Sequence, residues 1–174
     1  MAIRKILTEP DPFLRQKSVK VDNVNEEIRS LMDDMVDTMY DAPGIGLAAI
    51  QIGIPKRVIV IDLNKEKEKK NPLYFINPEI ITKSNNDASY EEGCLSVPNQ
   101  FAEISRPDKC KVKFLDYEGN ERILEADGLL ATCIQHEMDH LEGILFIDYL
   151  SKLKKSMIVK KLSKQKKNLE RIVV

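Results

Sequence analysis

The two histidines of the chain stand four residues apart in the string His136-Glu137-Met138-Asp139-His140. On a helix, four residues turn about 400° and rise about 6 Å, so both imidazoles leave one face and can bind the same metal ion. Glu137 lies about 100° further round, where its carboxylate can reach a water on that ion. The string is therefore typical of a metal-dependent hydrolase that carries its own general base. The alternative is a pair of surface histidines on an amphipathic helix.

The residues on either side of this string predict the helix that it needs. Apolar residues recur at helical spacing between Leu129 and Leu141. Asp127 is placed to cap the N-terminus of the helix, and Gly143 is placed to end it. Histidines on such an apolar helix would be buried, and buried imidazoles need polar partners. A metal ion would supply one.

A catalytic metal site needs a third protein ligand and keeps one position for water. Cys133 shares a helix face with His136, but an ion held by both histidines would lie level with residue 138. Cys133 would then be about 7.5 Å of helical rise behind the ion, and helical side chains lean further toward the N-terminus. We therefore place Cys133 in the core or in the wall of a pocket.

Cys94 is a better candidate for the third ligand. It lies in Glu91-Glu92-Gly93-Cys94-Leu95-Ser96-Val97-Pro98, where glycine and proline predict a rigid, non-helical segment. A metal-bound cysteine is a thiolate. Taken alone, the segment is equally consistent with a small core residue at Cys94. Cys110 lies inside an apparent strand and has no feature that favours a functional role.

A third segment, Gly44-Ile45-Gly46-Leu47-Ala48-Ala49-Ile50-Gln51-Ile52-Gly53, follows the first predicted helix directly. Its glycines allow close backbone approach and unusual dihedral angles. Gln51 carries the only side chain in this run that can donate a hydrogen bond. Taken alone, the segment is also consistent with a helix end followed by a buried strand.

Hydrophobic periodicity predicts the elements that must position these residues. An apolar stripe from Val24 to Tyr40 predicts an amphipathic helix. Strands are predicted at residues 57–63, 73–81, 103–105, 109–115 and 122–125, with a charged connection at 65–70 and a last helix over residues 150–171. This order indicates an α+β fold, with mostly antiparallel sheets packed around a central metal-binding helix and with an N-terminal and a C-terminal helix.

Length and composition exclude several classes of protein. A chain of 174 residues fits one domain with a substantial core, which we expect to be catalytic over residues 1–150 and to carry residues 151–174 as a basic helical extension. The chain has 43% hydrophobic and 32% charged residues, so it is neither disordered nor membrane-spanning. Three cysteines form no disulfide framework, and the first residues lack a secretory signal. We therefore expect a soluble, cytoplasmic protein.

Together the three segments resemble a known family. GIGLAAIQIG at residues 44–53, EEGCLSVP at 91–98 and QHEMDHLEG at 135–143 resemble, in this order, the three signature motifs of the peptide deformylases. The predicted elements between the motifs also fit, and the helical tail resembles the bacterial class of the family that ends in a helix. The resemblance implies a hydrolase that removes the formyl group from the N-terminal formylmethionine of nascent polypeptides and releases formate.

The resemblance also implies roles for individual residues. One divalent metal ion would be held by three ligands: Cys94, His136 and His140. The resemblance favours Fe²⁺, with Zn²⁺, Ni²⁺ or Co²⁺ as air-stable substitutes in purified protein. Catalysis would fall to Glu137 as general base and acid, and to Gln51 and the backbone N–H of Leu95 as the oxyanion hole. Residues that hold the substrate or support the site would be Ile45, Gly46, Glu92, Leu129 and Cys133.

Two other functions remain as alternatives. A zincin-type metallopeptidase uses the same His-Glu-x-x-His helix, but its third ligand is usually a downstream Glu or His. The chain has no third histidine, and Glu142 lies about 200° round the helix from His140. A non-catalytic, metal-stabilised binding module would need a fourth protein ligand to close the site.

The tail beyond Tyr149 combines an apolar stripe with many lysines. Leu153, Met157, Ile158, Leu162, Gln165 and Leu169 recur at helical spacing, so one face of the helix is expected to pack or to meet a partner. Eight lysines make the rest strongly basic. Such a charge run is commonly a solvated face. The family resemblance implies a second possibility, attachment to the ribosome, in addition to the formylmethionyl peptides that the enzyme would bind.

Overall fold

The computed structural model describes residues 2–64 and 66–172. Within these residues the helices are α1 (Glu26–Asp41), α2 (Gly128–Leu141) and α3 (Lys152–Ile172), and the strands are β1 (Gly46–Ala48), β2 (Val58–Ile61), β3 (Leu73–Lys83), β4 (Asp87–Cys94), β5 (Val97–Pro107), β6 (Lys109–Leu115) and β7 (Glu121–Asp127). Short 3₁₀ helices lie at η1 (Pro12–Arg15), η2 (Ala49–Ile52), η3 (Lys67–Lys69) and η4 (Phe146–Tyr149). None of the helices in these ranges is long and apolar enough to cross a membrane.

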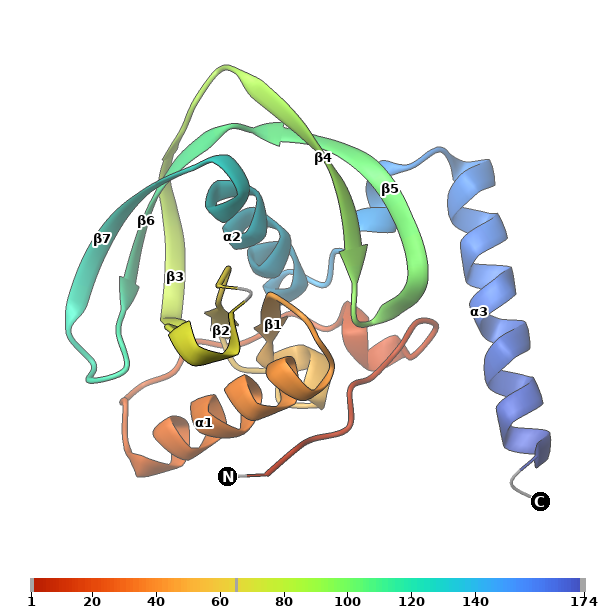
Figure 1. Cartoon of the computed structure of the whole chain (residues 1–174), viewed down its shortest axis with the longest axis horizontal. Helices are drawn as coiled ribbons and strands as arrows, with labels where there is room; N and C mark the ends of the chain where they lie inside the picture. Colours follow the sequence, from red (N-terminus) through yellow and green to blue (C-terminus); the bar gives the residue numbers. More distant parts are fainter. Residues whose placement is uncertain (1, 65, 173–174) are drawn as a thin grey trace.

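The strands form two antiparallel sheets around α2, which confirms the predicted α+β architecture. One sheet has the order β1-β2-β3-β6-β7, and the other is the hairpin of β4 and β5. Figure 1 shows α2 in the middle of the molecule, between β3, β6 and β7 on one side and β4 and β5 on the other. In this view helix α1 lies along the bottom of the molecule, and α3 lies at the side next to β5.

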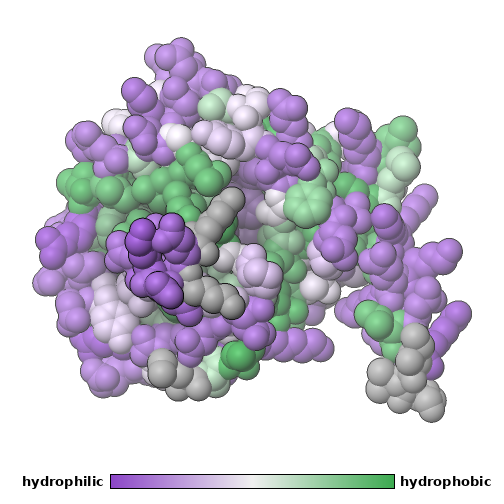
Figure 2. Space-filling view, in the orientation of Figure 1, coloured by the Kyte–Doolittle hydropathy of each residue, from purple (hydrophilic) through white to green (hydrophobic). Residues whose placement is uncertain are grey.

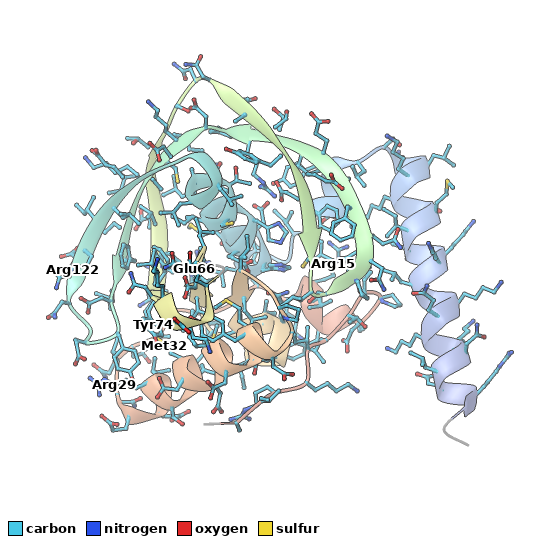
Figure 3. All side chains as sticks on the ribbon, in the orientation of Figure 1. Arg15, Arg29, Met32, Glu66, Tyr74 and Arg122 are labelled. Carbon is cyan, nitrogen blue, oxygen red and sulfur yellow. The ribbon has the colours of Figure 1, made fainter. Side chains whose placement is uncertain are left out.

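The core explains why these segments fold as they do. The apolar stripe of α1 packs on the five-stranded sheet, where Met32 is fully buried and Tyr74 of β3 packs against the same cluster (Figure 3). Asn25 caps α1, because its side chain accepts a hydrogen bond from the N–H of Ile28 at 3.1 Å. A second apolar cluster joins α2 to the opposite face of this sheet, through residues such as Phe75 and Ile134. Helix α2 is thus buried on most of its circumference, as a central helix must be.

The structure differs from the predicted elements in several local details. The strand over Asp87–Cys94 was not predicted, and residues 103–105 belong to a strand of 11 residues. After β1, the segment that was also consistent with a buried strand turns into the 3₁₀ helix Ala49–Ile52. Asp127 stands at the N-cap position of α2, but its side chain makes no capping hydrogen bond.

The tail forms the predicted helix, but only part of its predicted apolar stripe packs against the rest of the molecule. Leu162 is 3% exposed and joins a third cluster with Phe146 and Val97, against which Ile158 and Val159 also pack. Leu153, Met157 and Leu169 of the predicted stripe are exposed and are not part of this cluster. Figure 2 shows mostly hydrophilic residues over the remaining surface of this helix.

Candidate active site

Helix α2 carries the His-Glu-x-x-His string into the interior. His136, Glu137 and His140 are 8%, 5% and 1% exposed. The helix ends at Leu141, and Gly143, predicted to stop it, follows two residues later with a φ of 75°. Its N–H donates to the carbonyl of His140 at 3.1 Å, and the N–H of Ile144 donates to the carbonyl of Asp139 at 2.9 Å. A side chain at Gly143 would also collide with the carbonyl of Arg15, 2.3 Å from the Cβ position.

The β4–β5 hairpin brings the thiol of Cys94 to this helix. Cys94 pairs with Val97 across a two-residue turn, whereas the preceding Gly93 pairs with Phe101. The register therefore shifts between Gly93 and Cys94, and such irregularities re-aim the next side chain. Leu95 stands in the turn itself. The non-helical presentation predicted for this segment is thus a tight turn beside a register shift.

The structure brings the three predicted metal ligands together. The ligand atoms of Cys94, His136 and His140 all lie within 4.8 Å of one another, and the Cys94 sulfur is 3.4 Å from Nε2 of His140. A thiolate with two imidazoles suits zinc, iron(II), nickel and cobalt. Among the described residues, no further Cys, His, Asp or Glu joins this group. The donor set therefore fits one ion with a position left for water, and not a closed structural site.

The carboxylate of Glu137 lies against the backbone of Gly46. A Cβ at Gly46 would stand 2.5 Å from Oε1 of Glu137, so the glycine leaves the room that the carboxylate occupies. Burial raises the pKa of Glu137 to about 7. Within the described ranges, no group makes a hydrogen bond to its Oε2. A buried carboxylate with an unused oxygen and a pKa near neutrality can accept a proton and return it.

Gln51 lies fixed beside the thiol. Its Oε1 accepts a hydrogen bond from the N–H of Ala48 at 2.9 Å, which determines the orientation of the amide. Its Nε2 then donates to Oγ of Ser96 at 3.0 Å and faces the sulfur of Cys94 at 3.5 Å. An N–H group therefore points at the edge of the candidate metal site.

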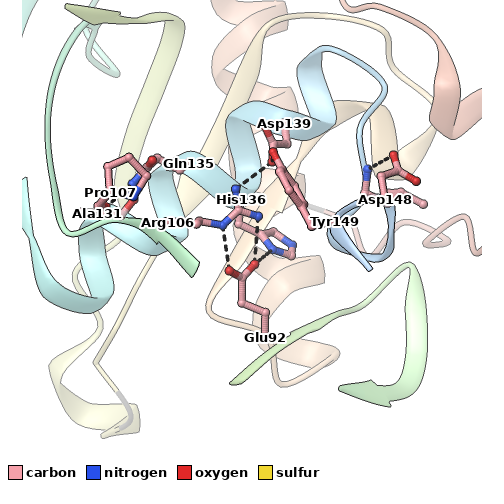
Figure 4. Close-up of polar contacts among 10 residues, drawn as sticks. Glu92, Arg106, Pro107, Ala131, Gln135, His136, Asp139, Asp148 and Tyr149 are labelled. Atoms are coloured by element: carbon pink, nitrogen blue, oxygen red, sulfur yellow. Dashed lines mark hydrogen bonds and ion pairs between the residues drawn. The ribbon is translucent and has the colours of Figure 1, made fainter. Parts of the chain in front are cut away.

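A hydrogen-bonded network supports His136 from behind (Figure 4). Oε1 of Glu92 is 2.7 Å from Nδ1 of His136. Arg106 donates to both oxygens of Glu92, at 2.8 Å and 3.1 Å, and to Asp139 at 2.8 Å. Burial opposes ionisation of Glu92, but the hydrogen bonds from His136 and Arg106 outweigh it and lower the pKa of this carboxyl. The pKa of Arg106 is raised, since these hydrogen bonds outweigh its burial.

A cleft of about 530 Å³ opens over Glu137 and His136. Predicted site residues that line it are Ile45, Gly46, Gln51, Glu92, Cys94, Leu95, Leu129, Cys133, His136 and Glu137, whereas His140 is not part of the lining. Leu129 and Ile45 are 41% and 38% exposed. Cys133 is in the cleft wall, as predicted, and burial raises its pKa to about 12, so its thiol is protonated and inert. Cys110 is buried in β6.

Four residues around the site have no clear signal in the sequence. Arg106, Asp139, Tyr149 and Ser96 make hydrogen bonds to predicted site residues or to one another. Asp139 lies within the histidine string, whose spacing indicates no role for it. Glu142, which helix geometry places away from the ligand face, forms ion pairs with Arg57 and Lys17.

A His-Glu-x-x-His helix, a thiol beside it and a cleft over a buried carboxylate are the features of a metal-dependent hydrolase. The chain belongs to the polypeptide deformylase family, whose family model matches residues 3–156. It is 67% identical to the peptide deformylase of Pelagibacter ubique (strain HTCC1062) over 174 residues, which is 100% of both chains. It is 55% identical to that of Rhizobium meliloti (strain 1021) over 167 residues, 96% of each chain.

Solved structures agree with this assignment. The peptide deformylase of Ehrlichia chaffeensis in complex with actinonin superposes with a TM-score of 0.91 at 44% identity, over 95% of this chain and 98% of that one. The peptide deformylase of Legionella pneumophila gives 0.89 at 45% identity, over 98% and 99%. The chain is therefore an enzyme that removes the formyl group from the N-terminus of nascent polypeptides, which confirms the predicted function.

Proposed function

We propose that deformylation by this chain depends on a divalent ion held by Cys94, His136 and His140, with Glu137 as general base and acid. The observation that carries the proposal is the placement of Glu137. Its carboxylate is buried, has an unused oxygen and lies in the floor of the cleft next to the three ligands. A carboxylate placed in this way can reach a water on the ion without being a ligand itself.

The chain's own residues then carry out the proton transfers. When bound, the ion lowers the pKa of its water toward about 7 and polarises a carbonyl group. Glu137 accepts a proton from the attacking water and later gives it to the amine nitrogen that departs from the formyl group. Nε2 of Gln51 and the N–H of Leu95 donate hydrogen bonds to the oxygen that becomes negative. Formate and the free amine leave, with no covalent bond to the protein.

The cleft supports recognition of a formylmethionyl chain. We assign Ile45, Leu129 and Cys133 to the walls of the methionine pocket, because all three line the cleft and present apolar surface or a protonated thiol. Gly46 contributes backbone, since Glu137 occupies the place of a side chain. Glu92 acts through His136, to which it is hydrogen-bonded.

The proposal is tested with matched substrates. The purified protein is expected to hydrolyse N-formyl-Met-Ala-Ser and to leave N-acetyl-Met-Ala-Ser and the internal peptide bonds of unblocked Met-Ala-Ser intact. The donor set suits zinc, iron(II), nickel and cobalt alike, and we propose Fe²⁺ as the native ion because the family resemblance favours it. Protein prepared without oxygen should therefore contain about one iron per chain and lose activity in air. Cleavage of the unblocked peptide would instead indicate the metallopeptidase alternative.

Gln51 offers a prediction on the oxyanion hole. Gln51→Leu is expected to lower kcat by about 10²- to 10³-fold with little change in KM, because a preorganised donor matters most in the transition state. The substitution also leaves the N–H of Ala48 without its acceptor. Gln51→Glu, which keeps that acceptor and lacks the donor, should show a comparable loss. A large rise in KM at unchanged kcat in both variants would make Gln51 a substrate-binding residue only.

We further propose that residues 1–150 form the catalytic domain, that residues 151–174 are a basic extension of it, and that this extension attaches to the ribosome. Leu162 anchors the helix to the rest of the molecule, which leaves the lysines outside. Lys160, Lys161, Lys164 and Lys167 are exposed. A basic helix face of this kind binds polyanions such as ribosomal RNA.

Changing Lys160, Lys161, Lys164 and Lys167 to Gln tests this attachment without removing the packing of Leu162. Hydrolysis of a short formyl peptide should stay unchanged. Binding to ribosomes, measured by co-sedimentation over a series of salt concentrations, should weaken and depend less steeply on salt, because each lost phosphate contact reduces the salt slope. Ribosome affinity that responds neither to the substitutions nor to salt would leave a solvated helix as the better interpretation.

A further inference from the structure

Arg106 joins two carboxylates behind the candidate metal centre. Its Nε and Nη2 groups donate to Glu92, and its Nη1 group donates to Oδ2 of Asp139 at 2.8 Å. The side chains of Arg106 and Glu92 are each 5% exposed. A guanidinium is planar and rigid, so an acceptor at Nη1 restrains the direction in which Nε and Nη2 meet the carboxylate of Glu92. The position of Glu92, the partner of His136, therefore depends on Asp139.

Tyr149 holds the outer end of this network. Its hydroxyl donates to Oδ2 of Asp139 at 2.7 Å, and its ring lies under the guanidinium of Arg106, whose Cζ is 4.9 Å from the ring centroid. Figure 4 shows these groups in one continuous set of contacts that leads from Tyr149 to His136. The Tyr149 side chain thus restrains both Asp139 and Arg106.

We propose that Asp139 and Tyr149 are positioning residues that, through Arg106 and Glu92, hold His136 in the orientation and tautomer that bind the metal ion. The inference rests on the proposed role of His136 as a ligand. A carboxylate on Nδ1 keeps the proton on that nitrogen, which leaves the lone pair of Nε2 for the ion. No described residue makes a hydrogen bond to Nδ1 of His140. Of the two imidazoles, only that of His136 is therefore held by a carboxylate, and that carboxylate is Glu92.

A purely structural role makes a different prediction. Removing one partner from a buried ion pair lowers stability, because the other charge stays buried. Metal affinity would then be unchanged as long as the protein is folded. Arg106, Asp139 and Tyr149 also line a second cleft, of about 300 Å³. Asp139→Asn and Tyr149→Phe therefore change hydrogen bonds at the wall of this cleft and leave the packed core intact.

The test compares Asp139→Asn and Tyr149→Phe with Tyr117→Phe. Tyr149→Phe keeps the ring beside Arg106 and removes only the hydroxyl. Tyr117 is a matched control, since its hydroxyl also lies near a carboxylate, Asp33, at 3.2 Å, on the α1 side of the molecule. The dissociation constant for Zn²⁺ is measured by competition with a chelator at a temperature where all variants are folded. The absorption spectrum of the Co²⁺-loaded proteins and their thermal unfolding are recorded in parallel.

We expect Asp139→Asn to weaken Zn²⁺ binding by about 10-fold, the low end of the range for loss of a direct partner of a metal-ligating histidine, because Asp139 acts through Arg106 and Glu92. Tyr149→Phe should weaken it in the same direction by a smaller factor, both should shift the Co²⁺ spectrum, and Tyr117→Phe should change neither. Lower thermal stability with unchanged Zn²⁺ affinity and spectrum in both site variants would overturn the proposal. His136→Ala separates this from a failure of the proposed function: if that variant binds Zn²⁺ as tightly as the parent, His136 is not a ligand.

Discussion

Replacing Glu137 by glutamine should leave one metal ion bound per chain and lower kcat/KM for a formyl peptide by about 10³- to 10⁴-fold, at the upper end of what a general base contributes. Glutamine keeps the shape of the side chain and fits the space beside Gly46, but it cannot accept the proton of water. Glu137 is not among the three side chains that could hold the ion, so the metal content should not change. Metal analysis and steady-state kinetics on the same preparation check both parts.

Glu142→Gln is a suitable control for this experiment. It removes the same charge from the end of the same helix, but Glu142 pairs with Arg57 at 2.7 Å and does not line the substrate cleft. Its activity should stay close to that of the parent. If Glu137→Gln instead lost the metal ion and kept part of its turnover, Glu137 would be a ligand, and the assignment of the base would be wrong.

The second large effect is expected at Cys94. Cys94→Ala removes the only sulfur among the three candidate ligands, so the protein should lose its metal ion during dialysis against a chelator and with it nearly all deformylation. Cys133→Ala is the matched control, because Cys133 lines the same cleft as Cys94. Cys133 lies on α2, about one turn before His136. That variant should keep its metal ion.

The two cysteine variants also separate ligation from packing. The thiol of Cys133 is buried and has a pKa of about 12, so its loss should change pocket shape, and hence KM, more than metal content. Elemental analysis measures the metal content of each variant. Circular dichroism recorded during heating measures its thermal stability. A metal-loaded, active Cys94→Ala protein would require another third ligand and would contradict the proposed site.

The sequence by itself determined the parts of this protein that depend on local spacing. The positions of His136 and His140 on one helix face follow from the helical repeat, and so does the apolar stripe of α1. The same geometry excluded Cys133 as a ligand, and the structure places that residue in the cleft wall. The order of helices and strands was enough to predict an α+β architecture, because the hydrophobic periodicity of each segment indicates its own conformation.

Strand β4 shows where local signals fail. Asp87-Ala88-Ser89-Tyr90-Glu91-Glu92-Gly93-Cys94 contains few β-branched or aromatic residues, so its sequence does not predict a strand. It is extended because it pairs with β5 along its whole length and lies beside α2. In the tail, likewise, the periodicity marked an apolar stripe, but only the packing decided that Leu162 is buried and Leu153 is exposed.

Only the tertiary structure decided which polar groups meet around the site. Arg106 lies 14 residues from Glu92 and 33 from Asp139, and nothing in the spacing of these residues indicates that one guanidinium serves both carboxylates. Gly46 is a glycine because Glu137, from a different element, fills its side-chain position. Periodicity reports the conformation of a single segment. The partner of a buried charge is determined by how distant segments pack. A charge that is removed from water needs an opposite charge or hydrogen bonds nearby, and these come from whichever segments pack against it.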